Sequence, residues 1–158
     1  MNELTIRHGR LEDLEELQKL FVGTISTICS KDYDSEQICV WTSSIENKDR
    51  WLDILTNQYL LVAQTKEYRI VGFGSLDKGD YIDLIYIHKD CHGQKIASKI
   101  YDSLEKEAIR LGKMTLSSDV SITARQFFER KGFNIIKEQR VLRQGVELTN
   151  FKMEKEIF

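Results

Sequence analysis

Residues 81–111, YIDLIYIHKDCHGQKIASKIYDSLEKEAIRL, read in turn as a buried strand, a polar turn and a long amphipathic helix. Positions 81–87 are apolar almost throughout, which is typical of a strand buried on both faces. From Ile96 onward the apolar residues recur at helical spacing, and Gly112 follows them as a stop signal. The first N–H groups of a helix lack backbone partners and carry partial positive charge. The turn at 92–98 therefore predicts an anion site, and a phosphate suits it best.

The composition indicates one globular domain. The chain has 158 residues, enough for a single domain over 1–158 with its own core. A net charge of −2 gives no general attraction to nucleic acid or to a membrane surface. No apolar run approaches the roughly 20 residues that a membrane crossing needs, and no apolar signal segment is present at the start, so we expect a cytoplasmic protein. Three scattered cysteines and three histidines predict neither disulfides nor a metal site.

Periodicity and turn residues predict the other elements. We expect strands at 4–7, 59–64, 69–76, 81–87, 113–118, 133–139 and 148–154, and helices at 11–21, 35–45, 96–111 and 122–131, with a further helical turn at 51–55. This order predicts an α/β chain with a mixed sheet, in which the helix at 96–111 connects two parallel strands by a right-handed crossover. Gly72 and Gly74 within a strand predict a bend or the close approach of another group.

At this point the chain resembles the GCN5-related N-acetyltransferase (GNAT) family over nearly its whole length. Residues 54–108 resemble the central core of the family, ITARQFFERKGFNII (122–136) its late helix-to-strand signature, and GVELTNFKMEKEI (145–157) its closing strand. The resemblance implies an acyl-CoA N-acyltransferase-like fold. Such a fold has a mixed, mostly antiparallel central sheet with a splayed parallel pair and flanking helices.

The family's pyrophosphate motif is Gln or Arg, two residues, Gly, any residue, then Gly or Ala. It falls on 92–97, where Ala97 fits, His92 replaces Gln or Arg, and Lys95 replaces the first Gly. Lys95 requires either a different backbone angle or a role for its ammonium group beside the phosphates.

The resemblance implies acetyl-CoA as co-substrate, held largely by backbone groups. The pantetheine arm would pair with the strand at Ile85, Tyr86 and Ile87, like an added strand. The pyrophosphate would lie against the turn, whose residues are His92, Gly93, Gln94, Lys95, Ile96, Ala97 and Ser98.

Direct transfer requires a neutral acceptor amine, so a base must remove its proton. Tyr81 and Asp83 lie two positions apart on one strand and share a face. Asp83 is the first candidate as base or anchor, and Tyr81, or Asp80 just before it, is the weaker one, although a hydrogen-bonded strand acid is an equal alternative for Asp83. Three aromatic residues, Tyr33, Trp41 and Trp51, either line the acceptor pocket or cover the core.

The late helix departs from the family at the position of its frequent tyrosine, which often protonates the departing thiolate. That position holds Phe128, which would pack on the pantetheine, and Ser121 stands where many members carry Asn. A water, Tyr86 or Tyr33 would then supply the proton, or the thiolate would leave unaided, since thiols titrate near about 8.5.

The sequence thus predicts an acetyl-CoA-dependent N-acetyltransferase acting by direct transfer in a ternary complex. The acceptor would be a primary amine on a small molecule or peptide, with no metal, nucleic acid or membrane involved. Homodimers are common in the family, and the sequence leaves that state open. Lys95 and Phe128 motivate the alternative, a non-catalytic CoA-binding or sensing domain of the same fold.

Overall fold

The computed structural model describes residues 3–93 and 95–158, and in them seven strands form one sheet in the order β1-β2-β3-β4-β5-β7-β6. The strands are β1 (Leu4–His8), β2 (Tyr59–Thr65), β3 (Ile70–Asp77), β4 (Tyr81–Ile87), β5 (Thr115–Ser121), β6 (Asn134–Arg143) and β7 (Val146–Glu156). The pair β4–β5 is parallel, and the other five pairings are antiparallel. The predicted mixed, mostly antiparallel sheet is confirmed.

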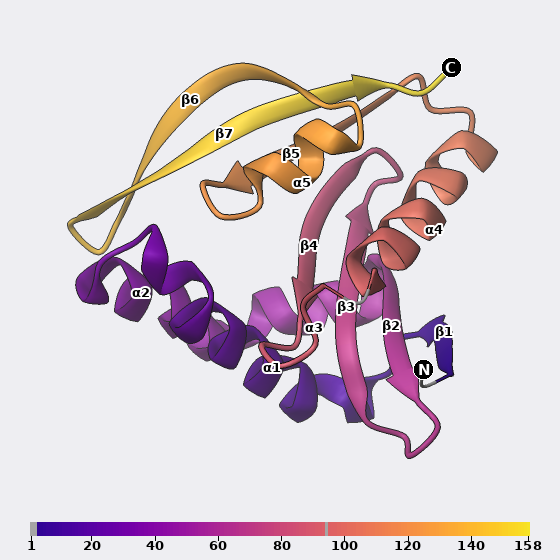
Figure 1. Cartoon of the computed structure of the whole chain (residues 1–158), viewed down its shortest axis with the longest axis horizontal. Helices are drawn as coiled ribbons and strands as arrows, with labels where there is room; N and C mark the ends of the chain where they lie inside the picture. Colours follow the sequence, from indigo (N-terminus) through magenta and orange to yellow (C-terminus); the bar gives the residue numbers. More distant parts are fainter. Residues whose placement is uncertain (1–2, 94) are drawn as a thin grey trace.

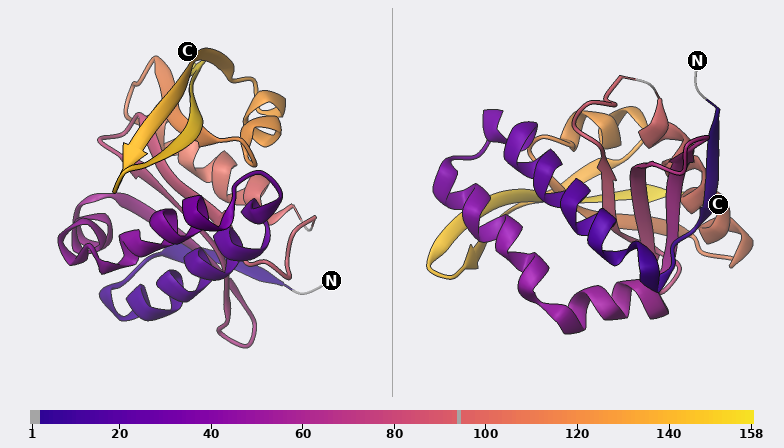
Figure 2. Two further views of the ribbon diagram at one scale, coloured as in Figure 1. Left: turned by 90° about the vertical axis from the view of Figure 1, so that its left-hand side faces the viewer. Right: turned by 90° about the horizontal axis from the view of Figure 1, so that it is seen from below.

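The helices lie in two layers, one on each face of the sheet (Figures 1 and 2). They are α1 (Leu14–Thr27), α2 (Ser35–Thr42), α3 (Lys48–Asn57), α4 (Ile96–Arg110) and α5 (Arg125–Arg130). One core includes buried residues of α4 and α5, such as Ile100 and Phe128, and the other includes Phe21 of α1 and Trp51 of α3. Because both faces are covered, the central strands are apolar at most positions.

The segment expected as a helical turn around Trp51 is instead a full helix of ten residues, α3. The Asn47 side chain caps it by accepting a hydrogen bond from the Arg50 N–H at 3.1 Å. The apolar pattern does not predict the first turn of this helix, because Lys48, Asp49 and Arg50 are all charged. The cap and the packing of Trp51 and Ile54 fix the helix.

Helix α4 approaches β3 closely at the two strand glycines, as Gly72 and Gly74 predicted. A Cβ atom at Gly74 would lie 2.7 Å from Ile100 Cγ2 and 3.3 Å from the Leu84 carbonyl oxygen. A Cβ atom at Gly72 would lie 2.9 Å from Ile87 Cδ1. The missing side chains therefore allow the helix that follows the turn to pack directly on the sheet backbone.

Strands β4 and β5 separate soon after they begin, which Figure 1 shows as a gap between the two ribbons. Their Cα register pairs Tyr81 with Ser117, and the buried Ser118 hydroxyl donates to the Ile82 carbonyl at 2.7 Å. Beyond that point the register between β3 and β4 shifts, so that Asp83 is an extra residue between Ile82 and Leu84. A bulge of this kind bends its strand and re-aims its side chains. Ile82 accordingly belongs to the core under α4, and Leu84 belongs to the core under α1.

We predict that Gly74→Ala destabilises the protein by roughly 1–3 kcal/mol, because the added methyl group overpacks a filled interface between α4 and β3. Urea unfolding followed by circular dichroism measures this change. Gly23→Ala in α1 is the matched control, since its new Cβ would meet only Lys89 Cδ at 3.9 Å. That control should be neutral or gain up to about 1 kcal/mol from helix propensity. Equal stability of Gly74→Ala and the parent would contradict the packing account.

Candidate active site

The second half of β4 presents a free backbone edge toward β5. The His88 N–H donates to the Val71 carbonyl at 2.8 Å, and hydrogen-bonding residues alternate along an antiparallel pair. The backbone of Tyr86 therefore faces β3, whereas the N–H groups of Ile85 and Ile87 face the gap. The Ile87 carbonyl accepts a hydrogen bond from Thr24 Oγ1 at 2.7 Å. Strand N–H groups that are not paired with a neighbouring strand can bind an extended ligand as an added strand.

The edge leads directly into the turn at 92–98 and the start of α4. Gly93 has φ +83°, and a Cβ atom there would meet nothing within 4 Å. Lys95 adopts the left-handed conformation, with φ +63°. The first helical bond runs from the Lys99 N–H to the Lys95 carbonyl at 3.2 Å, which leaves the N–H groups of residues 96–98 without helical acceptors. Gln94 lies outside the described residues.

The backbone at the start of α4 shows how the turn accommodates Lys95 in place of glycine. The backbone at Lys95 adopts the left-handed conformation that glycine reaches at least cost, so Lys95 carries a strain that glycine at this position would not. His92 is exposed, and its Nε2 lies 3.1 Å from the Ile87 carbonyl oxygen, so its imidazole helps to hold the turn against β4. The open N–H groups and the uncrowded Gly93 fit a pyrophosphate.

The bulge residue Asp83 is held in an ion pair that sequence reasoning did not anticipate. Its carboxylate accepts two hydrogen bonds from the Arg50 guanidinium, at 3.0 and 3.2 Å, and one from Gln58 Nε2 at 2.8 Å. The Asp83 side chain is 12% exposed and that of Arg50 is 42% exposed. The alternative of a hydrogen-bonded strand acid therefore describes the contacts of Asp83. No sequence pattern links Arg50 in α3 to a strand 33 positions later.

Tyr81 lies on the same side of β4 as Asp83, as predicted, and forms part of a second polar network. Its hydroxyl donates to Asp119 Oδ2 at 2.7 Å, and Gln139 Nε2 donates to Asp119 Oδ1 at 2.8 Å. Burial, followed by the Asp119 hydrogen bond, raises the pKa of the Tyr81 phenol, so Tyr81 remains a proton donor. A cavity of about 340 Å³ adjoins this network. Its lining residues are Tyr81, Ser117, Ser118, Asp119, Gln139 and Lys152.

Two of the three aromatic residues proposed for the acceptor pocket are core residues. Tyr33 is 5% exposed, and its hydroxyl donates to the Thr149 carbonyl at 2.6 Å and accepts from the Ile122 N–H at 3.0 Å. Trp51 is 2% exposed, and its indole N–H donates to the Ser44 carbonyl at 3.1 Å. Their polar tips are thus bound to backbone groups. Trp41 is half-buried and packs edge-on against Tyr33 with ring centroids 5.2 Å apart.

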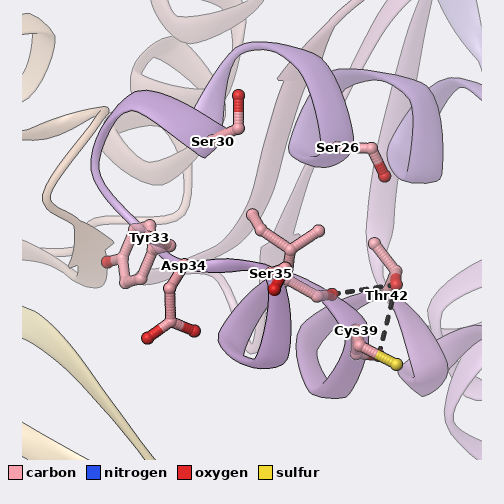
Figure 3. Close-up of a pocket in the computed structure, with 8 residues that line it drawn as sticks. Ser26, Ser30, Tyr33, Asp34, Ser35, Cys39 and Thr42 are labelled. Atoms are coloured by element: carbon pink, nitrogen blue, oxygen red, sulfur yellow. Dashed lines mark hydrogen bonds between the residues drawn. The ribbon is translucent and has the colours of Figure 1, made fainter.

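A further pocket of about 460 Å³ lies between the end of α1 and α2 (Figure 3). Several lining residues carry hydroxyl groups, and the set is Ser26, Ser30, Tyr33, Asp34, Ser35, Ile38, Cys39 and Thr42. All of them belong to the segment from α1 to α2, so the pocket has no wall from β4, β5 or α4. It is separate from the open edge of β4.

Phe128 of α5 and Ser121 of β5, both predicted to contact the cofactor, have defined contacts within the protein. Phe128 is 2% exposed and packs edge-on against Phe127 and Phe133, with ring centroids 5.7 and 5.0 Å apart. Ser121, at the end of β5, accepts a hydrogen bond from the Ala124 N–H at 3.1 Å and so caps the turn before α5. Their contacts with a cofactor stay predictions.

No helix in the described ranges combines the length and the apolar character required to cross a membrane. The model of the acetyltransferase (GNAT) domain family matches residues 29–155. An uncharacterized N-acetyltransferase of Escherichia coli, YafP, is 33% identical over 153 residues, which cover 97% of this chain and 96% of that protein.

Solved structures give the same result for the fold. A GCN5-related N-acetyltransferase from Rhodopseudomonas palustris superimposes with a TM-score of 0.93 at 31% identity, covering 99% of this chain and 97% of that one. A PaiA N-acetyltransferase from Thermoplasma acidophilum, solved in complex with coenzyme A, shares the fold with a TM-score of 0.78 at 18% identity, over 98% of this chain and 99% of that one. With the family model matching most of its length, this chain belongs to the GNAT family of acetyltransferases.

Proposed function

We propose that this acetyltransferase moves the acetyl group of acetyl-CoA to a primary amine by direct transfer in a ternary complex. The observation that carries the proposal is the unpaired edge of β4, which ends at Ile87, together with the unpaired N–H groups at the start of α4, which begins at Ile96. One extended ligand with an amide-bearing arm and a pyrophosphate fits both features at once.

The cofactor half of the site uses backbone groups. Ile85 and Ile87 would bind the pantetheine arm through their outward N–H groups. The N–H groups from Gly93 to Ser98 would bind the pyrophosphate. When bound, acetyl-CoA supplies a thioester carbonyl as the electrophile. An N–H group of Ile85 or Ile87 would stabilise the negative charge that develops on the carbonyl oxygen, and a fixed dipole inside a dry cleft does this without reorganisation.

The acceptor half would lie on the face opposite α4, where Tyr81 and Asp83 point. Both oxygens of Asp83 already accept hydrogen bonds, which favours a role as anchor over a role as base. Tyr81 keeps its proton and would orient the Asp119 carboxylate, to which its hydroxyl donates. The proton of the attacking amine would pass to a water molecule and from there to bulk solvent, since proton transfer can run through a bridging water.

Protonation of the departing sulfur would also depend on water. Phe128 has no acidic proton, and the phenol proton of Tyr33 is bound to the Thr149 carbonyl. Burial raises the pKa of the Tyr86 phenol, which makes it a weak acid for this step. A thiolate with a conjugate acid near pKa 8.5, roughly, leaves readily enough that this step needs no dedicated acid.

The same two departures, Lys95 and Phe128, favour the second candidate, a CoA-binding domain without transfer activity. A thermal shift with acetyl-CoA, CoA and ATP, followed by an amine panel, separates the two functions. We expect both CoA forms to raise Tm and ATP to have little effect, since a ligand of the native state must stabilise it. We then expect acetylation of at least one amine. Binding without any product would support the second candidate, and no shift with either CoA form would overturn both.

We predict that Gly93→Leu weakens CoA binding by about tenfold or more, because a side chain at φ +83° strains the turn that would hold the pyrophosphate. Isothermal titration with CoA measures the Kd. Gly145→Leu is the matched control, because Gly145 has φ +78° with the same open surroundings but lies in the β6–β7 turn. An unchanged Kd in Gly93→Leu would contradict the placement of the pyrophosphate.

Lys95→Gly distinguishes the backbone from the ammonium group. We expect the Kd for CoA to stay within about threefold, because glycine adopts the observed left-handed angle freely and leaves the N–H cradle in place. A loss of about tenfold, equal to about 1.4 kcal/mol, would instead assign the phosphate contact to the Lys95 charge. The titration used for Gly93 measures both outcomes.

Asp83→Asn should lower kcat/KM for the acceptor by about tenfold or more, because it leaves a partly buried Arg50 guanidinium without its carboxylate. The Kd for CoA should change much less. Arg50→Met tests the assigned role. If Asp83 is an anchor fixed by Arg50, the two variants lose activity to a similar extent, whereas a base would make Asp83→Asn far worse. Full activity of Asp83→Asn would remove Asp83 from the mechanism.

A further inference from the structure

We propose that Asp119 selects the acceptor by binding a second cationic group on it, so that the preferred acceptor is a diamine. The inference rests on the proposed transfer function and names the substrate class of the same site. It assigns the cavity beside β4 and β5 to the part of the acceptor that does not react.

Asp119 lies on the acceptor side of the sheet. Leu116 and Val120 of β5 belong to the core under α4, and side chains alternate along a strand, so Asp119 points to the other face. Tyr81 points the same way, and its hydroxyl contacts Asp119 across the two strands at 2.7 Å. The carboxylate lines the cavity of about 340 Å³, whose lining residues come from β4, β5, β6 and β7.

The two carboxylates of the site differ in how their charge is balanced. Asp83 is bound by the Arg50 guanidinium, so its charge is compensated within the protein. Asp119 is held by two neutral donors, Tyr81 and Gln139, and Gln139 is itself fixed by Asn150 at 3.0 Å. No ion pair within 4 Å involves Asp119 among the residues that the structure describes. Neutral donors orient a carboxylate and leave its charge for a ligand.

Lys152 is a competing charge in the same cavity. It pairs with Asp119 in the β5–β7 register and lines the same cavity, yet it lies beyond ion-pair distance. Its ammonium group repels a cation on the β7 side of the cavity, so a cationic group would approach Asp119 from the side of Tyr81. That side faces β4, along which the proposed acceptor half of the site lies.

The strand register places Asp119 close to the point where β4 leaves β5. Tyr81 is level with Ser117 in the parallel pair, and Asp119 lies two residues beyond Ser117, which is about 7 Å along an extended strand. Two diamines of different length, 1,4-diaminobutane and 1,5-diaminopentane, are suitable probes for the second amine.

The experiment compares kcat/KM for each diamine with that for the monoamine of equal chain length, butylamine or pentylamine, at saturating acetyl-CoA. We expect the wild type to prefer the diamine by about twofold to fivefold, because Asp119 is exposed and an exposed ion pair contributes up to about 1 kcal/mol. Asp119→Asn, which keeps the shape, should reduce this ratio to near one. Asp102→Asn on α4 is the control carboxylate and should leave the ratio unchanged, and Lys152→Gln should raise it.

Binding is measured apart from turnover, as the Tm increase that each diamine gives with CoA present. Acetylation of monoamines with no preference for diamines, or the same ratio in Asp119→Asn, would overturn the anchor and leave the transfer function intact. Diamine binding that depends on Asp119 without any acetylation would support the anchor and overturn the transfer. A preference for 4-aminobutanoate, which replaces the second ammonium by a carboxylate, would also overturn the anchor.

Discussion

The bulge at Asp83 is the constraint on which the two halves of this molecule depend. One extra residue between Ile82 and Leu84 turns β4 away from β5 and ends the parallel pairing almost as soon as it begins. The carboxylate of that residue is tied to Arg50 and Gln58 at the two ends of α3, so the helix braces the bend. Without the bend the sheet would continue across β4 and β5, and the N–H groups of Ile85 and Ile87 would be used up by the neighbouring strand.

The sequence reveals the cofactor side better than the acceptor side, for a physical reason. The strand, turn and helix at 81–111 follow one another along the chain, so local periodicity predicts them and the structure matches them closely. The close approach of α4 at Gly74 is predictable in the same way. The hydrogen bonds between Asp83 and Arg50 join residues 33 positions apart, and the one between Tyr81 and Asp119 joins residues 38 positions apart. No local pattern encodes such pairs.

Aromatic residues show the same limit. Tyr33 and Trp51 suit a pocket and a core equally well by composition, and only their backbone partners identify them as core residues. Lys95 shows a different case, in which the residue departs from the family motif and takes the left-handed backbone angle that glycine adopts most easily. A site built from N–H groups tolerates such changes because every residue except proline carries the same donor. The acceptor side is built from side chains, so each substitution there changes its chemistry.

The hydrogen bonds of Tyr33 have a consequence for the order in which the chain can fold. Its hydroxyl joins the segment before α2 to Ile122 and to Thr149, a separation of 116 residues in the second case. Gln37 in α2 likewise binds the Glu147 carbonyl, 110 residues away. Contacts this distant along the chain form late, because the loop they close must lose its entropy first. During synthesis on the ribosome, the contacts between α2 and β7 can form only after nearly the whole chain has emerged, whereas the β2–β3–β4 meander can assemble earlier.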